Sequence, residues 1–500
     1  MPNADTEAAW RYHNATRHSP ESVRRSARGL DWSNQPLPFK IYRDLEPFAL
    51  PAQLPTTGVA ALSAIAADTA AAPDGVPDLA ALAHLFYFSA GITKRRRYPG
   101  GEILFRAASC TGALYEIELY LVCGDRPDLP AGVYHFNPAD FALRRLRQGD
   151  YRRVLLEATA GEDSMARAAA AIISTGTYWR NAWKYGARTY RHFGWDNGTV
   201  LANLLAAAAA LGCPARLLCG FVDAEVNRLL GLDTHREVSL SIISLGRAER
   251  LPPEAPAMAP LRPVPPSRKE TDYPEMRDMH EASSLAEPGE VLAWRDGPLD
   301  VPLPAPLALR TELPGDGIEE VVLRRGSTRR FARRSITLAQ LSAILARSTR
   351  GIAADFLSPF GARLNDLYII VNAVESLAAG AYFYDTGTGA LEPLKVGDFR
   401  RTAAFLALEQ DLAGDAAAAV FFLADLARWL ARFGNRGYRA VELEAGILGG
   451  KVYLAAYAQK LGATGLTFYD DEVSGFFSPH AAGNSAIFLT AVGHPAHRRG

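Results

Sequence analysis

The sequence predicts an α+β fold in which two copies of one domain follow each other along the chain. Its 500 residues are too many for one ordinary hydrophobic core. Residues 118–120 resemble residues 366–368, which follow them by 248 positions (366 − 118 = 248). Two further pairs of segments have this offset: residues 131–134 and 379–382, and residues 149–153 and 397–401. A constant offset indicates duplication, and helical patterns that alternate with β-prone runs in both copies indicate α+β.

The first copy, residues 76–250, opens with an apolar segment that predicts a helix over residues 79–90. The β-prone run 117–122 predicts a buried strand. Asp196 is expected to cap a helix that ends near Leu211, before Gly212. The remaining expected elements are a hairpin over residues 133–136 and 141–146 and a closing strand over residues 239–245.

The second copy, residues 313–500, repeats this order. Its expected elements are a helix over residues 338–345, a strand over 367–371, a hairpin over 382–394, a long helix over 438–461 and a strand over 486–492.

Residues 1–75 and 251–312 lie outside the repeat. The first segment is an N-terminal extension, polar and irregular over residues 12–18 and kept extended afterwards by prolines. The second begins with seven prolines between residues 252 and 266, which remove backbone donors and block helix formation. It is therefore expected to be an extended tether or a wrapping arm.

The composition excludes several classes of protein. The 54 basic and 54 acidic side chains balance, which argues against a general nucleic-acid binder. No apolar run reaches the ~18 residues of a membrane span, and the N-terminus lacks a signal-peptide pattern. The four cysteines lack the spacing of a metal site, so we expect reduced thiols, no metal and a cytoplasmic location.

The first candidate site reads Arg-Gly-Ser-Thr-Arg over residues 325–329. Alternate side chains of an extended segment share a face, so Arg325, Ser327 and Arg329 could converge on one phosphate. A solvated basic turn is the alternative. The first copy has no comparable residues around position 77, so only one copy carries this candidate clamp.

Small residues precede the strand at 117–122 and form the second candidate. They would let a flat ligand approach the backbone, whereas tight packing at a strand start is the alternative. The second copy keeps a Gly-Ala pair in residues 358–363 but carries the bulky Phe360. The candidate ligand-binding residues of the first copy are Arg106, Ser109, Gly112 and Ala113.

Lys184 and Tyr185 are the third candidate and the expected catalytic residues. A lysine in a dry pocket has its charged form disfavoured, which lowers its pKa toward that of a useful base. A surface lysine beside a core tyrosine is the alternative. Adjacent residues of a helix point about 100° apart, so both can face one ligand only if the backbone is irregular, as Gly186 permits.

Three further stretches are weaker candidates. The turn containing Gly465 and Thr467 could offer backbone groups to a ring, and Arg498 and Arg499 could close on the phosphate or form a frayed tail. The basic run 94–97 is expected to be a solvated loop, with docking of an acidic partner as the alternative.

These motifs resemble the nitroreductase superfamily of FMN proteins, and most closely the SagB-type azoline dehydrogenases that mature thiazole- and oxazole-containing peptides. Residues 325–329 resemble the family's Arg-x-Ser-x-Arg phosphate motif, and residues 106–114 resemble its Arg-Pro-Ser-Ala-Gly-Ala-Leu segment. Lys184-Tyr185 resembles the Lys-Tyr pair given a catalytic role in azoline oxidation, which simple nitroreductases lack. The resemblance covers about residues 80–246 and 315–499.

The resemblance implies how the two copies cooperate. Family members are dimers that hold FMN between subunits, one binding the phosphate and the other supplying the Ser/Gly segment. This chain is therefore expected to form an intramolecular pseudo-dimer with one complete FMN site. The reciprocal site, which would contain Phe360, Arg432 and Phe433, is expected to hold no flavin.

The implied activity is FMN-dependent dehydrogenation of a peptidic thiazoline or oxazoline in natural-product biosynthesis. The azoline would be bound to a peptide or a carrier protein, and molecular oxygen would reoxidise the flavin. No nucleic acid or membrane partner is expected, and a higher homo-oligomer of the pseudo-dimer is left open. The alternatives are an NAD(P)H-dependent nitroreductase or flavin reductase, and a non-catalytic flavin-binding subunit of a synthetase complex.

Overall fold

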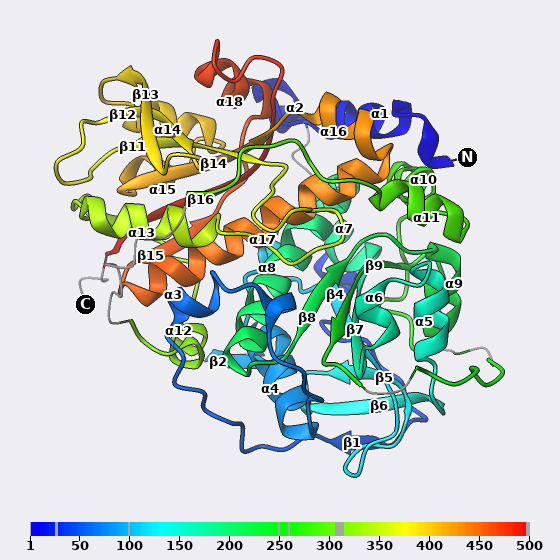
Figure 1. The fold of residues 1–500 in the computed structure, drawn as a ribbon. Helices are drawn as coiled ribbons and strands as arrows, with labels where there is room; N and C mark the ends of the chain where they lie inside the picture. The colour runs from blue at the N-terminus through cyan, green and yellow to red at the C-terminus, as the bar shows by residue number, and fades with distance from the viewer. Residues whose placement is uncertain are drawn as a thin grey trace.

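Two sheets, each with its own helices, lie on either side of two long central helices (Figure 1). The computed structural model describes residues 2–25, 29–98, 101–248, 251–258, 261, 263–305 and 315–496. The expected α+β class is confirmed, and both sheets are antiparallel throughout.

The first sheet has the strand order β1-β6-β5-β4-β7-β9-β8. Its strands are β1 (Pro47–Ala49), β4 (Ile117–Cys123), β5 (Gly132–Asn137), β6 (Ala142–Gln148), β7 (Ala170–Thr177), β8 (Ala215–Leu218) and β9 (Glu237–Leu245). Its helices are α4 (Leu79–Ala90), α5 (Arg152–Ala158), α6 (Asp163–Ala166), α7 (Tyr178–Tyr185), α8 (Thr189–Ala210) and α9 (Asp223–Leu230).

The second sheet has the order β10-β16-β14-β11-β12-β13, and β15 pairs with β16 beside this path. Its strands are β10 (Phe331–Ala332), β11 (Asp366–Val371), β12 (Gly380–Asp385), β13 (Ala390–Val396), β14 (Ala418–Ala424), β15 (Gly462–Gly465) and β16 (Ser485–Pro495). Its helices are α12 (Ile318–Arg324), α13 (Leu338–Ser348), α14 (Arg400–Leu406), α15 (Asp411–Asp415), α16 (Leu426–Phe433), α17 (Arg436–Ala458) and α18 (Asp470–Phe477).

The two halves repeat the same elements at the offset seen in the sequence. Strands β7 and β14 begin at Ala170 and Ala418 (418 − 170 = 248), and helices α7 and α16 begin at Tyr178 and Leu426 (426 − 178 = 248). The predicted duplication is therefore a structural repeat.

Helices α8 and α17 pack along a seam of small residues. A Cβ on Gly198 would lie 2.4 Å from the carbonyl carbon of Gly446, and one on Gly450 would lie 2.6 Å from the Cβ of Ala202. Gly198 and Gly446 occupy equivalent positions in the two copies (446 − 198 = 248). The halves thus meet as the subunits of a symmetric dimer do, each presenting the same surface to the other.

Two buried ion-pair clusters repeat this symmetry. Arg191 of the first half donates to Asp470 of the second at 2.6 Å, while Arg439 of the second half donates to Asp223 of the first at 2.8 Å. Burial alone would raise the pKa of Asp223, but the charges of Arg436 and Arg439 hold it at about 2. In each copy an Arg-x-x-Arg segment, Arg188 to Arg191 and Arg436 to Arg439, supplies these ion pairs. This recurring spacing is the feature of the sequence that marks the interface.

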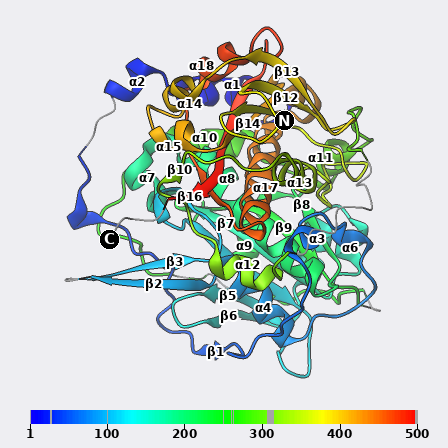
Figure 2. The ribbon, with the colours of Figure 1, turned by 90° about the vertical axis from the view of Figure 1, so that its left-hand side faces the viewer.

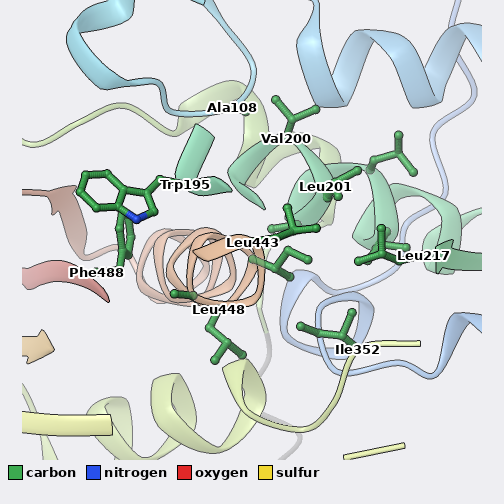
Figure 3. Close-up of a cluster of buried hydrophobic side chains, with 14 of the residues drawn as sticks. Ala108, Trp195, Val200, Leu201, Leu217, Ile352, Leu443, Leu448 and Phe488 are labelled. Atoms are coloured by element: carbon green, nitrogen blue, oxygen red, sulfur yellow. The ribbon is translucent and has the colours of Figure 1, made fainter. Parts of the chain in front are cut away.

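The hydrophobic core is continuous between the halves. Trp195, Val200 and Leu201 of α8 lie beside Leu443 and Leu448 of α17 (Figure 3). Because one cluster contains side chains from both copies, separating the halves would expose the core of each.

The N-terminal extension differs from its prediction. Residues 12–15 are not irregular, because they end helix α1 (Glu7–Ala15), whereas residues 16–18 form the loop that follows it. Tyr12 donates from its hydroxyl to the carbonyl of Ala187 at 2.6 Å, and the amide of Ala9 donates to Asn435 Oδ1 at 2.9 Å. Helix α1 is therefore anchored to residues of both halves where they meet. Two short helices also belong to the extension: α2 (Pro20–Arg25) and α3 (Ala61–Ala64).

The linker is only partly extended. Its described proline-rich part contains no helix, as expected, but helices α10 (Pro274–Ala282) and α11 (Pro288–Arg295) follow. Trp294 of α11 donates to the carbonyl of Phe433 at 3.1 Å, so the linker wraps around the second half as well as connecting it.

A two-stranded hairpin, β2 (Ile92–Tyr98) and β3 (Gly101–Arg106), projects from the body (Figure 2). The basic run 94–97, expected to be a loop, is part of β2. None of the helices in the described residues has both the length and the hydropathy that crossing a membrane requires.

Candidate functional site

Arg325 joins the two halves of the site. It directly follows α12 and is buried, and its guanidinium donates to the carbonyls of Ala107 (2.7 Å) and Arg106 (3.1 Å). The candidate phosphate clamp of the second copy (residues 325–329) therefore contacts the small-residue segment of the first copy (residues 106–113). A site shared by the two copies would require such a contact.

Ser327 and Arg329 lie on the same loop in different surroundings. The hydroxyl of Ser327 is 3.3 Å from that of Tyr453 on α17, and Ser327 pairs with Ala463 of β15. Arg329 is exposed. The loop and α17 thus bring the hydroxyl groups of Ser327 and Tyr453 together near Arg325, and Arg329 follows on the same loop. Guanidinium and hydroxyl donors of this kind fit a phosphate.

Lys94 is a member of this site that the sequence did not reveal. Its ammonium group donates to the carbonyls of Arg325 (2.5 Å) and Arg324 (2.9 Å). Burial and the charge of Arg325 lower its pKa. The contact crosses between the copies, and nothing in a run of four basic residues indicates which one will make it.

The segment from Arg106 to Ala113 leads from the clamp toward Tyr185. Arg106 is buried and donates to the carbonyl of Pro38 at 2.7 Å, so it secures the extension. The carbonyl of Ser109 accepts from Thr199 at 2.6 Å. Gly112 has φ +63°, and a Cβ there would lie 2.7 Å from the Tyr185 hydroxyl. Small residues are thus required at the point where the two candidate motifs meet.

Tyr185 is the last residue of α7, which ends at Gly186 with φ +56°. Its phenol is half-buried, and burial, followed by the charges of Asp196 and Cys110, raises its pKa well above the ordinary value. The charge of Arg329 acts on it in the opposite direction. Tyr185 of the first half and Arg329 of the second therefore lie within electrostatic reach of each other.

Lys184 does not lie in a dry pocket. Its side chain is exposed, and its Nζ is 5.2 Å from the centroid of the Tyr185 ring. The expectation of a buried lysine is therefore wrong. The irregular backbone expected at this pair is present, because helix α7 ends there and Gly186 takes a positive φ.

The turn after α17 lies beside the same clamp. The amide of Gly465 donates to the Tyr453 hydroxyl, which also contacts Ser327. The Thr467 hydroxyl is 3.3 Å from Nδ1 of His18, in the extension. Residues 464–468 were expected to be a turn, but Gly465 ends strand β15 and only the following residues form a loop. Arg498 and Arg499 lie outside the described residues.

Behind Tyr185 lies an acidic cluster that the sequence analysis missed. The Cys110 thiol is 3.3 Å from Glu116 Oε2 and 3.4 Å from Asp196 Oδ2. Asp196 was expected to cap α8, but that helix begins at Thr189. Its carboxylate instead accepts from the amide (2.9 Å) and hydroxyl (3.0 Å) of Thr111, which fixes the loop beside Gly112.

The Lys184-Tyr185 pair lines a cleft of about 710 Å³. Helix α7 forms one wall with Trp179 and Trp183, while the extension and the linker contribute the others, including Asp31 and Tyr273. Trp183 donates to the carbonyl of Asp31 at 2.9 Å. The volume is in the range of small-molecule and cofactor sites.

At the reciprocal position, side chains from a loop and the linker contact the turn, and a smaller cavity of about 460 Å³ remains beside Arg432 and Phe433. The Asp355 carboxylate accepts from the amides of Cys219 (2.9 Å) and Gly220 (2.8 Å), on the turn that corresponds to Leu466 and Thr467 (466 − 219 = 247). Trp294 lies against this turn, 3.1 Å from where a Cβ of Gly220 would be.

Phe360 does not occupy the reciprocal turn and instead lies against Gly351. Arg432 and Phe433 reproduce the Lys184-Tyr185 arrangement, with the guanidinium 4.8 Å from the ring centroid.

The family model for nitroreductases matches this chain in two segments, residues 105–247 and 322–481. The chain belongs to the nitroreductase family. The two matched segments correspond to the two structural copies, so the tandem organisation predicted from the repeat is confirmed.

Solved and curated relatives agree with this membership. A crystal structure of a protein described as a nitroreductase from Anabaena variabilis ATCC 29413 aligns over 98% of this chain and 100% of its own, with a TM-score of 0.77 and 26% identity. MJ1384 of Methanocaldococcus jannaschii, also named as a nitroreductase, is 25% identical over 166 residues, which are 33% of this chain and 79% of that protein.

The trifolitoxin-processing protein TfxB of Rhizobium leguminosarum bv. trifolii is 29% identical over 170 residues. The match spans 33% of this nitroreductase-family chain and 46% of TfxB, less than half of that protein.

Members of the family generally bind FMN. The donor set around Ser327 fits the phosphate of such a cofactor, and Ala107 and Ala108 leave the neighbouring segment free of bulky side chains. The chain is accordingly a nitroreductase-family oxidoreductase in its fold and in the chemistry of its donor groups.

Proposed function

We propose that this chain is an FMN-dependent dehydrogenase that converts a peptidic thiazoline or oxazoline into the aromatic azole. The observation that carries the proposal is the position of Lys184 and Tyr185. They line a cleft of about 710 Å³, and Tyr185 abuts the segment that Arg325 holds to the clamp. The proposal joins a proton acceptor of the first half, in this cleft, with a flavin-binding motif of the second half that lies beside the cleft rather than in its lining.

The cofactor would be held by residues of both copies. Arg325, Ser327 and Arg329 would supply donors for its phosphate, while the segment of Gly112 and Ala113, which contacts Tyr185, would lie beside its ring. FMN supplies the two-electron chemistry when bound, by accepting a hydride from the azoline.

Lys184 and Tyr185 have different tasks in this mechanism. Burial and the neighbouring acidic groups raise the pKa of Tyr185, so its phenol remains a neutral hydroxyl that can orient the substrate by a hydrogen bond. Lys184 is exposed to the cleft, and its amine would take the ring proton. The oxidation is completed outside these residues by molecular oxygen, the proposed electron acceptor.

A peptide is the proposed substrate for two reasons. The cleft is walled in part by the extension and the linker, which lie outside the two segments that the family model matches, so these additions can adapt it to a substrate larger than a simple nitroreductase needs. The similarity to a protein named for processing trifolitoxin also supports a peptide.

Replacing Lys184 by alanine tests the proposal. The variant is expected to keep the absorbance of bound flavin and to lose turnover of a thiazoline peptide by roughly 100-fold or more, because general base catalysis contributes at least that much. Arg432→Ala is the matched control, since Arg432 is the counterpart of Lys184 in the other half (432 − 184 = 248). Full turnover by Lys184→Ala would refute the assigned role.

An NAD(P)H-dependent nitroreductase or flavin reductase is the second candidate, favoured by the names of the Anabaena and Methanocaldococcus relatives. Anaerobic mixing separates the two. Rapid bleaching of the bound flavin by NADPH supports the reductase, whereas bleaching by a thiazoline peptide alone supports the dehydrogenase.

A further inference from the structure

The β2–β3 hairpin has two open edges. Among the strands of the described chain, β2 and β3 pair only with each other, so each leaves a row of backbone donors and acceptors unpaired. Soluble proteins usually protect such edges, often with charged side chains that repel unsuited strands, and an open edge can accept an added strand of complementary charge.

Basic side chains cover one of these strands. Residues 94–97 of β2 are all exposed, with Arg95 at 53% and Arg97 at 87% side-chain exposure, and Glu102 is the single acidic residue of the hairpin. Glu102 lies 3.7 Å from Arg95 and 3.6 Å from Arg97, so one carboxylate is shared by two guanidinium groups. The hairpin therefore keeps a net positive charge, although the whole chain is neutral.

The base of the hairpin lies at the proposed flavin site. Lys94 is hydrogen-bonded to the carbonyl of Arg325, and β3 ends at Arg106, whose carbonyl accepts from Arg325. The amide of Ala107 also donates to the carbonyl of Gly91, just before β2, at 2.8 Å. A chain lying along the hairpin would therefore be led to the clamp and the small-residue segment.

We propose that the outer edge of β2 docks an acidic, extended segment of the substrate peptide as a third strand. The identification of that segment as substrate rests on the proposed function. Arg95 and Arg97 share one face of the strand and Arg96 lies on the other, so acidic residues at alternate positions of an added strand would meet the two arginines. Opposite charges across neighbouring strands stabilise the pairing, and main-chain hydrogen bonds supply the rest.

A nucleic acid fits these observations less well. A backbone of phosphates needs a broad basic surface to displace its counterions, whereas this chain has equal numbers of acidic and basic residues and one short basic run on a strand. An open strand edge instead complements a polypeptide backbone.

Binding of a labelled peptide to the full chain tests the docking without turnover. The probe is a short peptide of alternating glutamate and valine, followed by fluorescence anisotropy at low salt and at about 0.5 M salt. A peptide with glutamine in place of glutamate removes the charge, and one N-methylated at alternate residues removes the strand-pairing groups. The acidic peptide is expected to bind about ten-fold more tightly than either analogue, and less tightly at high salt.

The variant Arg95→Gln/Arg97→Gln is expected to weaken binding about three- to ten-fold. Arg24→Gln/Arg25→Gln, on exposed α2, removes equal charge far along the chain and should bind as the wild type does. Unchanged flavin absorbance and unfolding midpoints show that the variants are folded.

Equal binding of the N-methylated peptide, or complete displacement of the acidic peptide by inorganic tripolyphosphate or NADPH, would overturn the proposal, because the hairpin would then recognise charge alone. The outcome is independent of catalysis. If the chain binds the peptide but does not oxidise an azoline, the proposed function is refuted and the docking proposal stands. If it oxidises the azoline normally but does not bind the peptide, the docking proposal is refuted and the proposed function stands.

Discussion

Tyr185 shows how a side chain from one half acquires its properties from several elements. Its hydroxyl abuts Gly112, its ring is 4.7 Å from that of His192, and the acidic groups of Cys110 and Asp196 lie behind it. All of these belong to the first half, and only the charge of Arg329 comes from the second. Its neutral form is therefore set by local packing, and its position at the clamp is set by the pairing of the halves.

Glu442 is buried where α8 and α17 meet, and it gives stability a pH dependence. Burial raises its pKa from 4.5 to about 7. A folded-state pKa above the unfolded one means that the folded state holds the proton more tightly. The resulting stabilisation is complete below pH 4.5 and is lost as the pH rises through about 7.

Glu442→Gln is therefore expected to be more stable than the wild type at pH 8, by about 3 kcal/mol, and equally stable at pH 4.5. Urea unfolding at both values measures the difference, and Glu472→Gln on the exposed face of α18 controls for the loss of one charge. A destabilised Glu442→Gln at both values contradicts the assignment.

The roles and contacts of single residues were harder to predict from the sequence than the elements or the overall organisation. Arg325, Ser327 and Gly112 could be proposed as site residues because their types and spacing suit the binding of a phosphate and of a flat ligand. The contact of Lys94 and the role of Asp196 could not, because each depends on what another segment places beside that residue. The exposed Lys184 matches the surface lysine that was the alternative from the sequence.

At the scale of elements, the seam between α8 and α17 depends on backbones that approach closely. Gly198 and Gly446 leave no room for a Cβ, and the atoms that it would meet belong to the main chain. A main-chain atom cannot move aside as the end of a flexible side chain can.

Gly198→Ala is accordingly expected to destabilise the chain by about 1–3 kcal/mol, as overpacking of a core does. The expected change has the opposite sign to the intrinsic helix preference, because alanine normally stabilises a helix by roughly 0.5–1 kcal/mol relative to glycine. Gly475→Ala in α18, where a Cβ would meet nothing within 4 Å, is the matched control and should be stabilising. Thermal or chemical unfolding midpoints that shift in the same direction for both variants would contradict this account.

Most regular elements were predictable, because their patterns are local. The helix at 79–90 was placed to the residue, and strands β4, β9, β11 and β16 were found within a few residues of their ends. Helices α1, α10 and α11 were missed because their stability comes from partners distant in the sequence, such as Asn435 and Phe433. The start of α8 was missed because Asp196 resembles a cap in its type and position.

At the scale of the molecule, the two potential cofactor positions are unequal. One carries the arginine clamp and small residues, and the other lacks these arginines and has Asp355 and Trp294 against its turn. The repeat predicted the pairing of the halves, while Asp355 and Trp294 belong to a loop and a linker that no repeat indicates.

One FMN per chain is therefore expected. Flavin absorbance at saturation, divided by protein concentration from amino-acid analysis, measures the ratio. Arg329→Ala should weaken flavin binding, because it removes an exposed donor of the clamp. Asp355→Ala should leave the ratio unchanged, because opening the second position does not supply its missing arginines. A ratio of two in the wild type would refute the asymmetry.

The contacts of the first residues, up to helix α1, also determine when folding can be completed during synthesis. Asn3 and Ala9 are bonded to Phe433, Asn435 and Arg436, so their partners leave the ribosome more than 400 residues after them. At about 5–20 residues per second, the N-terminus must wait on the order of 20–90 s for a place to dock. Until then the nascent first half carries an uncovered seam, and a factor that shields it would act in that interval.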